Sequence, residues 1–94
     1  MDIGHANLFA KENRSLNLIN NFGKILKHIH VHDNVGGDAE KFDLHLPIGT
    51  GNINFTPIFD KLKEIEYSGN ITLEIHNSDR EYRKISLNRI RKLR

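Results

Sequence analysis

Residues 28–32 read His-Ile-His-Val-His, so three imidazoles alternate with two aliphatic side chains. A repeat of two residues is typical of a β-strand, in which all three imidazoles point to one face. Neutral imidazole is a common ligand of Mn, Co, Zn and Fe ions. Asp33 and Asn34 follow and open a glycine-bearing loop. Since α/β proteins build their sites at the carboxyl ends of parallel strands, we expect a functional site there.

Glu74 is a second candidate, because it lies inside an apolar strand pattern between Leu73 and Ile75. A carboxylate is costly to bury in such a strand unless it is paired or bound to a metal. An ion pair with a lysine such as Lys27 is the alternative to a metal.

Two further pairs have the spacing of possible ligands. Asp43 and His45 lie on one side of an extended segment, and Asp2 is followed three residues later by His5. From the residues alone, Asp2 could instead be solvated at the terminus and His5 could cap a turn. The histidines of residues 28–32 could likewise be structural. Residues 47–51, Pro-Ile-Gly-Thr-Gly, could offer backbone amides to an anionic substrate group or form a plain turn.

Helical and strand patterns alternate along the chain. Ser15 is expected to cap the first helix and Gly23 to end it, and Ser78 with Glu81 forms a capping-box pattern before the last helix. The elements we expect are a helix at 15–22, a strand at 25–32, a long loop at 34–51, a helix beginning at Asn54 or Thr56, a strand at 71–76 and a helix at 78–94.

This alternation predicts an α/β fold with a parallel sheet of two strands and, at Met1–Asp2, the stub of a third. Such a sheet has open edges and a partly bare face, which favours self-association. We therefore interpret residues 1–94 as one partial domain of a larger structure.

Composition narrows the function classes. The chain has no cysteine, which excludes disulfides and thiolate metal sites. It also has no apolar run of membrane-spanning length and no signal peptide, so a cytoplasmic location is the expectation.

The formal charge of +2 hides a contrast along the chain, because residues 80–94 carry seven basic residues and one acidic one. We interpret this basic helix as a solvated face that packs through Tyr82, Ile85, Ile90 and Leu93, rather than as a phosphate-binding surface.

The motifs DIGHA at 2–6, HVHDN at 30–34, DLHLPIGTGNINF at 43–55 and LEI at 73–75 follow one another in the chain. In this order and spacing they resemble the xylose isomerase-like barrel superfamily, which includes divalent-metal sugar isomerases and epimerases and the apurinic endonucleases related to endonuclease IV. The resemblance implies a partial (β/α)8 TIM barrel, roughly the last three strand–helix units. A whole barrel needs ~250 residues, so it also implies a truncated chain.

The resemblance further implies a divalent metal, either Mn, Co, Zn or Mg. Glu74 would then be catalytic as well as a ligand, and His5 matches a histidine that touches substrate in the epimerases. In the endonucleases, the residues matching His5, Asp43 and His45 hold an additional zinc. The residues matching the superfamily's metal ligands are Asp2, His30, Glu74, Asp43 and His45.

Other residues around this expected site have supporting roles in our interpretation. His28 and His32 are expected to line the pocket, and Asp33 to accept a hydrogen bond from the free ring nitrogen of His30. A fourth ligand, a glutamate that an earlier strand supplies in the superfamily, has no counterpart in this sequence.

Three functions follow as alternatives. The first is a carboxyl-terminal part of a metal-dependent isomerase or epimerase for a sugar or sugar phosphate, inactive on its own. The second is part of an apurinic endonuclease relative. Residues 35–51 hold one lysine, Lys41, and one aromatic residue, Phe42, which gives little means of holding DNA, so a nucleic-acid partner is not expected. The third is a truncated product without catalysis.

Overall fold

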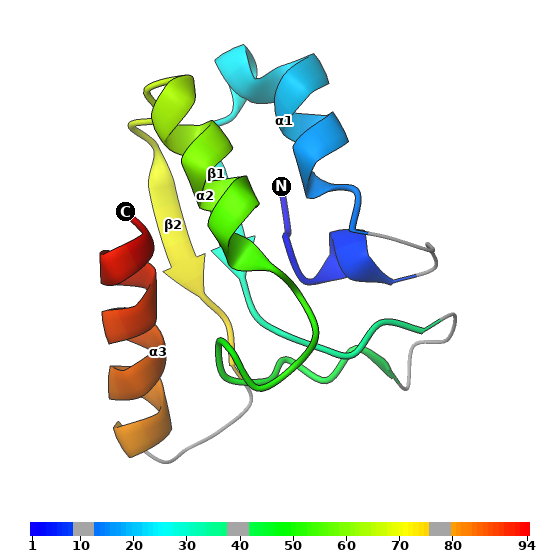
Figure 1. Ribbon diagram of the computed structural model, residues 1–94, viewed down its shortest axis with the longest axis vertical. Helices are drawn as coiled ribbons and strands as arrows, with labels where there is room; N and C mark the ends of the chain where they lie inside the picture. Colours follow the sequence, from blue (N-terminus) through cyan, green and yellow to red (C-terminus); the bar gives the residue numbers. More distant parts are fainter. Residues whose placement is uncertain (9–12, 38–41, 76–79) are drawn as a thin grey trace.

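The computed structural model of the chain describes residues 1–8, 13–37, 42–75 and 80–94 (Figure 1). Short 3-10 turns precede and follow the first helix. In chain order the elements are η1 (His5–Asn7), α1 (Ser15–Phe22), η2 (Gly23–Ile25), β1 (His28–Val31), α2 (Phe55–Glu64), β2 (Asn70–Leu73) and α3 (Arg80–Leu93). No helix in these described ranges combines the length and the apolarity needed to cross a membrane.

The sheet is parallel, as predicted. β1 and β2 pair from His28 opposite Asn70 to Val31 opposite Leu73. On the other side of β1, Asp2 forms a parallel bridge with His30, where the His30 amide donates to the Met1 carbonyl at 2.9 Å. The predicted stub therefore exists, and β1 lies between it and β2.

One face of this sheet is covered and the other is not. Ile29 and Val31 point to the covered face and are fully buried, whereas His28 and His30 point away from it. α1 and α2 lie on the covered side, and α3 lies along the outer side of β2 (Figure 1). The core therefore gathers behind the sheet; its buried members are Ile3, Ile19, Ile29, Val31, Ile48, Ile53, Phe55, Ile58, Phe59, Leu62 and Ile90.

Both strands are shorter than predicted. Residues 23–25 form a 3-10 turn, and the side chain of Ile25 is 73% exposed, so apolar alternation at this end does not reflect burial. β2 ends at Leu73, although the Glu74 amide still donates to the Val31 carbonyl at 2.9 Å. The predicted strand end at residue 76 lies outside the described residues.

Two predicted helix starts differ in detail. Ser15 is the first residue of α1 rather than its cap, and its amide donates to the Asn13 side-chain oxygen at 2.8 Å. Asn54 is the residue before α2, but its side chain makes no capping hydrogen bond. The predicted cap at Ser78 lies outside the described residues.

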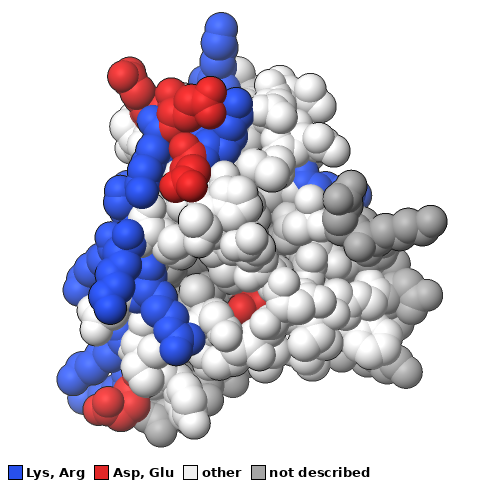
Figure 2. Space-filling view, in the orientation of Figure 1, with Lys and Arg blue, Asp and Glu red and all other residues white. Residues whose placement is uncertain are grey.

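α3 packs against the core through Ile90 and Leu93, as predicted, but the other two predicted packing residues are exposed. Ser86 and Ile90, four residues apart, are buried, whereas Tyr82 is 46% and Ile85 is 42% exposed. The physical reason is a polar contact: the Ser86 hydroxyl accepts a hydrogen bond from the Ile48 amide at 3.0 Å, which turns that row toward the loop. Lys and Arg side chains gather over α3 on the outer surface (Figure 2).

Candidate metal centre

Asp2, His30 and Glu74 come together where the stub, β1 and β2 end. Each offers one ligand atom, and these atoms lie within 4.8 Å of one another. The His30 Nδ1 atom is 3.0 Å from a Glu74 carboxylate oxygen. Glu74 thus pairs with a histidine, and within the described chain no ion pair joins it to Lys27. The three strand ends bring the group together because they are adjacent and parallel.

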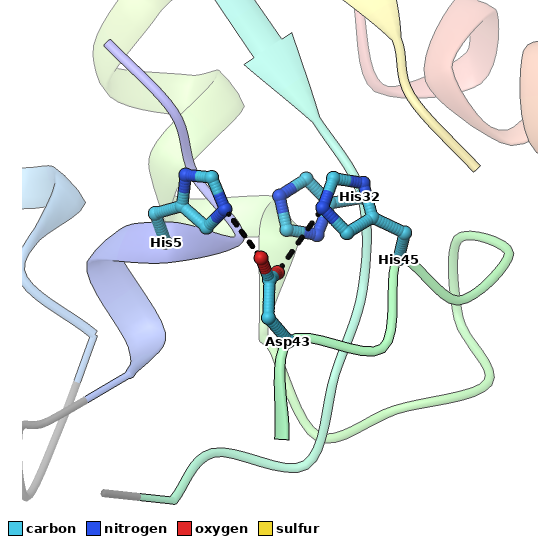
Figure 3. Close-up of side chains that lie close together, drawn as sticks. All are labelled: His5, His32, Asp43 and His45. Atoms are coloured by element: carbon cyan, nitrogen blue, oxygen red, sulfur yellow. Dashed lines mark hydrogen bonds and ion pairs between the residues drawn. The ribbon is translucent and has the colours of Figure 1, made fainter. Parts of the chain in front are cut away.

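A second group lies beside the first. Its members are His5, His32, Asp43 and His45, and their ligand atoms also lie within 4.8 Å of one another. The Asp43 carboxylate is 2.9 Å from His5 Nε2 and 3.1 Å from His45 Nε2 (Figure 3). Three segments meet here: η1 supplies His5, the end of β1 supplies His32, and the following loop supplies Asp43 and His45.

Asp2 connects the two groups. One of its carboxylate oxygens lies 2.8 Å from His32 Nε2 and accepts a hydrogen bond from the His5 amide at 2.9 Å. The other oxygen lies 3.1 Å from His5 Nδ1. A change in the position of Asp2 would therefore disturb both groups.

His32 is more than the pocket-lining residue we predicted. Its side chain is fully buried, and its ring stacks on His45 with the ring centroids 3.9 Å apart and the planes 7° apart. Gly4 leaves the room for this ring, because a Cβ atom on Gly4 would lie 1.9 Å from His32 Cε1. Strand alternation already placed His32 on the face of His30; its contacts with Asp2 and His45 are not visible in the sequence.

Asp33 does not serve His30, contrary to our prediction. It is fully buried, and one of its carboxylate oxygens accepts hydrogen bonds from the amides of Gly49 and Gly51 at 2.9 and 3.0 Å. The other oxygen accepts from the amides of Asn34 and Ile53. Asp33 therefore holds the glycine-bearing loop onto the end of β1.

The backbone amides of residues 47–51 are not available to bind an anionic substrate group, so of the two alternatives for this segment the plain turn is the one observed. The amides of Gly49 and Gly51 point to Asp33, and the Ile48 amide points to Ser86. The Thr50 amide donates to the Pro47 carbonyl within the turn. The glycines serve the turn itself, and Gly49 adopts a φ of 91° that side chains rarely tolerate.

Sequence reasoning missed three asparagines that support the site from outside. The side-chain amide of Asn7 donates to the side-chain oxygens of Asn34 and Asn52 at 2.8 and 2.9 Å. Asn34 in turn donates to the Gly4 carbonyl at 2.9 Å. Asparagines are frequent in turns, so nothing in the sequence separates these three from the rest. Together they join η1 to both ends of the loop.

Three side chains in the centre have shifted pKa values. Burial acts to raise the pKa of the Asp2 carboxyl, but the His32 ring and the His5 amide outweigh it and lower that pKa. Partial burial likewise opposes the contacts of Asp43 with His5 and His45, which lower the Asp43 pKa. For His5, partial burial disfavours the charged ring, yet Asp43 and Asp2 raise its pKa.

These shifts predict how the stability of the metal-free chain depends on pH. The raised pKa of His5 contributes stability that is complete below pH 6.5 and is lost as the pH rises through the folded value. The lowered values of Asp2 and Asp43 contribute stability that is complete above pH 3.8 and is lost as the pH falls through their folded values. We expect this contribution to be greatest between those two limits.

Thermal melts in a chelator across this range are the measurement. The effect is expected to be small because His5 is 51% exposed and well screened. His5→Gln should remove the decline on the alkaline side, and His28→Gln, on the same face of β1 but in neither group, should leave it. A stability that climbs steadily above pH 6.5 would contradict the expectation.

The donor set suits divalent ions. Carboxylate oxygens with imidazole nitrogens bind Mn, Co and Zn, and carboxylates bind Mg. His32 supports this, because its Nδ1 atom is buried and makes no hydrogen bond with the described residues, while its Nε2 atom faces the Asp2 carboxylate at 2.8 Å. A buried polar atom without a partner calls for an ion or a water. The residues therefore fit a metal, and their role as ligands stays a prediction.

Comparisons with known proteins show which proteins this chain resembles. Two uncharacterized proteins of Methanocaldococcus jannaschii are similar: MJ1311 is 46% identical over 76 residues, 81% of this chain and 25% of that protein, and MJ1614 is 42% identical over 82 residues, 84% of this chain and 28% of that protein. The crystal structure of a D-tagatose 3-epimerase-like protein matches 98% of this chain and 32% of its own, with 41% identity and a TM-score of 0.75.

The chain thus spans about a quarter to a third of the length of these relatives. Its parallel strands and outer helices match a fragment of a TIM barrel, which confirms the predicted fold class. The family described as xylose isomerase-like TIM barrel matches residues 1–93. The chain belongs to the xylose isomerase-like TIM barrel family.

Proposed function

We propose that this chain carries the metal-binding part of a divalent-metal-dependent isomerase or epimerase for a sugar or sugar phosphate. The observation that carries the proposal is the convergence of Asp2, His30 and Glu74 from three adjacent strand ends. The likeness to an epimerase-like protein supports the choice of reaction.

Each residue of this group has a distinct task in the proposal. Asp2 and His30 would hold the ion together with Glu74. A bound divalent ion polarises carbonyl and hydroxyl oxygens and so makes a neighbouring C–H more acidic. The Glu74 side chain is 35% exposed, so its carboxylate is accessible to take that proton and return it. His5 lies beside Asp2 with half of its ring exposed, where it is placed to contact a sugar hydroxyl.

The proposal includes that the isolated chain binds this ion weakly and does not turn over substrate. The expected fourth ligand, a glutamate, has no counterpart among the 94 residues. A missing carboxylate leaves the ion under-coordinated and removes a proton carrier, and such groups typically contribute ~10²–10⁴-fold to rate. The open sheet edges also favour self-association of the isolated chain.

Calorimetric titration with Mn²⁺, run beside a sizing column, tests these points. We expect weak binding by the chain and none by Glu74→Gln. Glu64→Gln, the same change at an exposed position on α2, is the matched control and should bind as the unchanged chain does. Conversion of D-tagatose is expected to be undetectable.

Three results other than those expected from the titration and the activity assay would change the proposal. Unchanged Mn²⁺ affinity in Glu74→Gln would remove Glu74 from the metal site. Tight stoichiometric binding by a monomer would show that the centre is more complete than proposed. Turnover that disappears in Glu74→Gln would refute the inactivity while supporting the residue.

An endonuclease-like function is the second candidate, favoured by the group around Asp43 and His45. It needs a surface that holds DNA, and in the sequence of 35–51 Lys41 is the only Lys or Arg and Phe42 the only Phe, Tyr or Trp. Incision of a duplex with an abasic site by this chain, sensitive to Asp43→Asn, would reverse the order of the two candidates.

A further inference from the structure

Two basic side chains of α3, Arg89 and Lys92, line one groove. The groove has a volume of about 340 Å³ and lies between α3, the start of α2 and the loop at Ile48 and Gly49. No ion pair joins either cation to a carboxylate of the described residues, and no acidic residue lines the groove. Positions three apart on a helix are neighbours, and like charges there repel each other. An anion in the groove would remove this repulsion.

The loop holds the Arg89 guanidinium in place. Its Nη1 atom donates a hydrogen bond to the Ile48 carbonyl oxygen. Gly49 leaves room for this contact, because a Cβ atom on Gly49 would lie 2.5 Å from Arg89 Nη1. The other N–H groups of Arg89 make no hydrogen bond with the described residues. A planar guanidinium that is fixed on one side and keeps donors on the other is suited to phosphate oxygens.

The other walls of the groove are mostly apolar. Ile53 and Phe55 line it and are otherwise buried, and the half-buried Leu93 lines it from α3. Asn54 and Thr56 add two exposed polar side chains. Sites for small molecules typically combine apolar walls with a few polar groups, in clefts of ~300–1,000 Å³. The groove therefore suits an anion with an organic body better than a bare ion.

We propose that this groove is a second binding site, which takes a small phosphorylated organic molecule. Arg89 and Lys92 bind its phosphate group, and its organic part lies against Ile53, Phe55 and Leu93. No residue from either group of candidate metal ligands lines the groove. The proposal goes beyond the proposed function, because it needs neither a divalent ion nor a reaction at the metal centre.

A ligand in this groove would connect three parts of the fold. It would bridge α3 to the start of α2 and to the loop, which α3 already contacts at Ile48 through Ser86 and Arg89. The next residue, Gly49, donates its amide to the buried carboxylate of Asp33. Because the groove exists only when these parts are folded together, the ligand should raise the melting temperature of the chain.

The test is a titration of the full chain with phenyl phosphate in excess chelator, which removes any metal that could bind the phosphate. We expect the melting temperature to rise and the NMR signals of the Ile48, Gly49 and Thr56 amides to shift. Inorganic phosphate should bind more weakly, because it does not fill the apolar walls. Lys92→Gln should weaken phenyl phosphate binding ~10-fold, the loss expected for one charged hydrogen-bond donor. Lys92 has no other partner among the described residues, so this variant should fold.

Two variants serve as controls. Lys84→Gln makes the same change at an exposed position of α3 outside the groove and should keep the affinity for phenyl phosphate. Glu74→Gln should keep it too, even though the proposed function requires this variant to lose Mn²⁺, so the two proposals fail separately.

Four results would overturn the proposal. The first is undiminished phenyl phosphate binding in Lys92→Gln, and the second is an equal loss in Lys84→Gln, which would mean general attraction by the basic helix. The third is equal affinity for inorganic phosphate. The fourth is a loss of binding in Glu74→Gln, or amide shifts at His5 and His45 in place of those in the groove, because the ligand would then bind at the metal centre.

Discussion

Asp33→Ala is expected to abolish folding of the chain. The buried carboxylate accepts hydrogen bonds from four backbone amides, those of Asn34, Gly49, Gly51 and Ile53. Each amide left without a partner costs ~1–3 kcal/mol, and the total is comparable to the whole stability of a domain of this size at ~0.05–0.15 kcal/mol per residue. Far-UV circular dichroism with urea titration is the measurement.

Asp60→Ala is the matched control for this prediction. Asp60 is exposed on α2 and only approaches Lys63 at 4.0 Å, so we expect a change within ~0.5 kcal/mol in the free energy of unfolding. A cooperative transition of Asp33→Ala near that of the unchanged chain would mean that the loop does not depend on this carboxylate.

Gly4→Ala adds one methyl group and is expected to damage both stability and metal binding. The new Cβ atom would lie 1.9 Å from His32 Cε1 and 2.2 Å from His32 Nδ1. The ring has little room to retreat, because it is fully buried and stacked on His45. Overpacking of this kind costs ~1–3 kcal/mol, and any shift moves His32 away from Asp2. Thermal melts and Zn²⁺ titration are the measurements.

Gly23→Ala makes the same chemical change, but here the atom in the way belongs to a side chain that can move. Gly23 has a φ of −55°, and its Cβ atom would meet the flexible end of the Ile65 side chain at 2.8 Å. We expect the free energy of unfolding to change by no more than ~1 kcal/mol. Equal Zn²⁺ affinity in Gly4→Ala and Gly23→Ala would show that the position of His32 is unimportant for binding.

Local pattern was sufficient to predict the sheet. The alternation in residues 28–32 separates Ile29 and Val31 from the histidines, and the structure places these two groups on opposite faces. The spacing in α2 was equally informative, since Phe55, Ile58, Phe59 and Leu62 are all buried. In both cases the spacing of apolar residues within one short segment is enough to predict which side chains face the core.

Contacts between distant segments were the part that pattern missed. From the sequence, Asp33 is a plausible hydrogen-bond acceptor for the metal ligand His30. Only the fold shows that its carboxylate instead accepts hydrogen bonds from the backbone amides of Gly49, Gly51 and Ile53. Tyr82 and Ile85 have the right spacing to pack, but Ser86 fixes the rotation of α3 through Ile48. In each case a polar contact across the fold outweighed local apolar spacing.

The attachment of Asp2 has a consequence for motion. The stub that carries it is held to β1 by a few hydrogen bonds, from the Met1 ammonium, the Ile3 amide and the His30 amide. Segments fastened so sparsely open locally at a smaller free energy than the sheet around them, which amide hydrogen exchange detects. Asp2 contacts both groups of candidate metal ligands, so one such opening would loosen both groups at once. The backbone amides of the two groups would then exchange with solvent at the same rate.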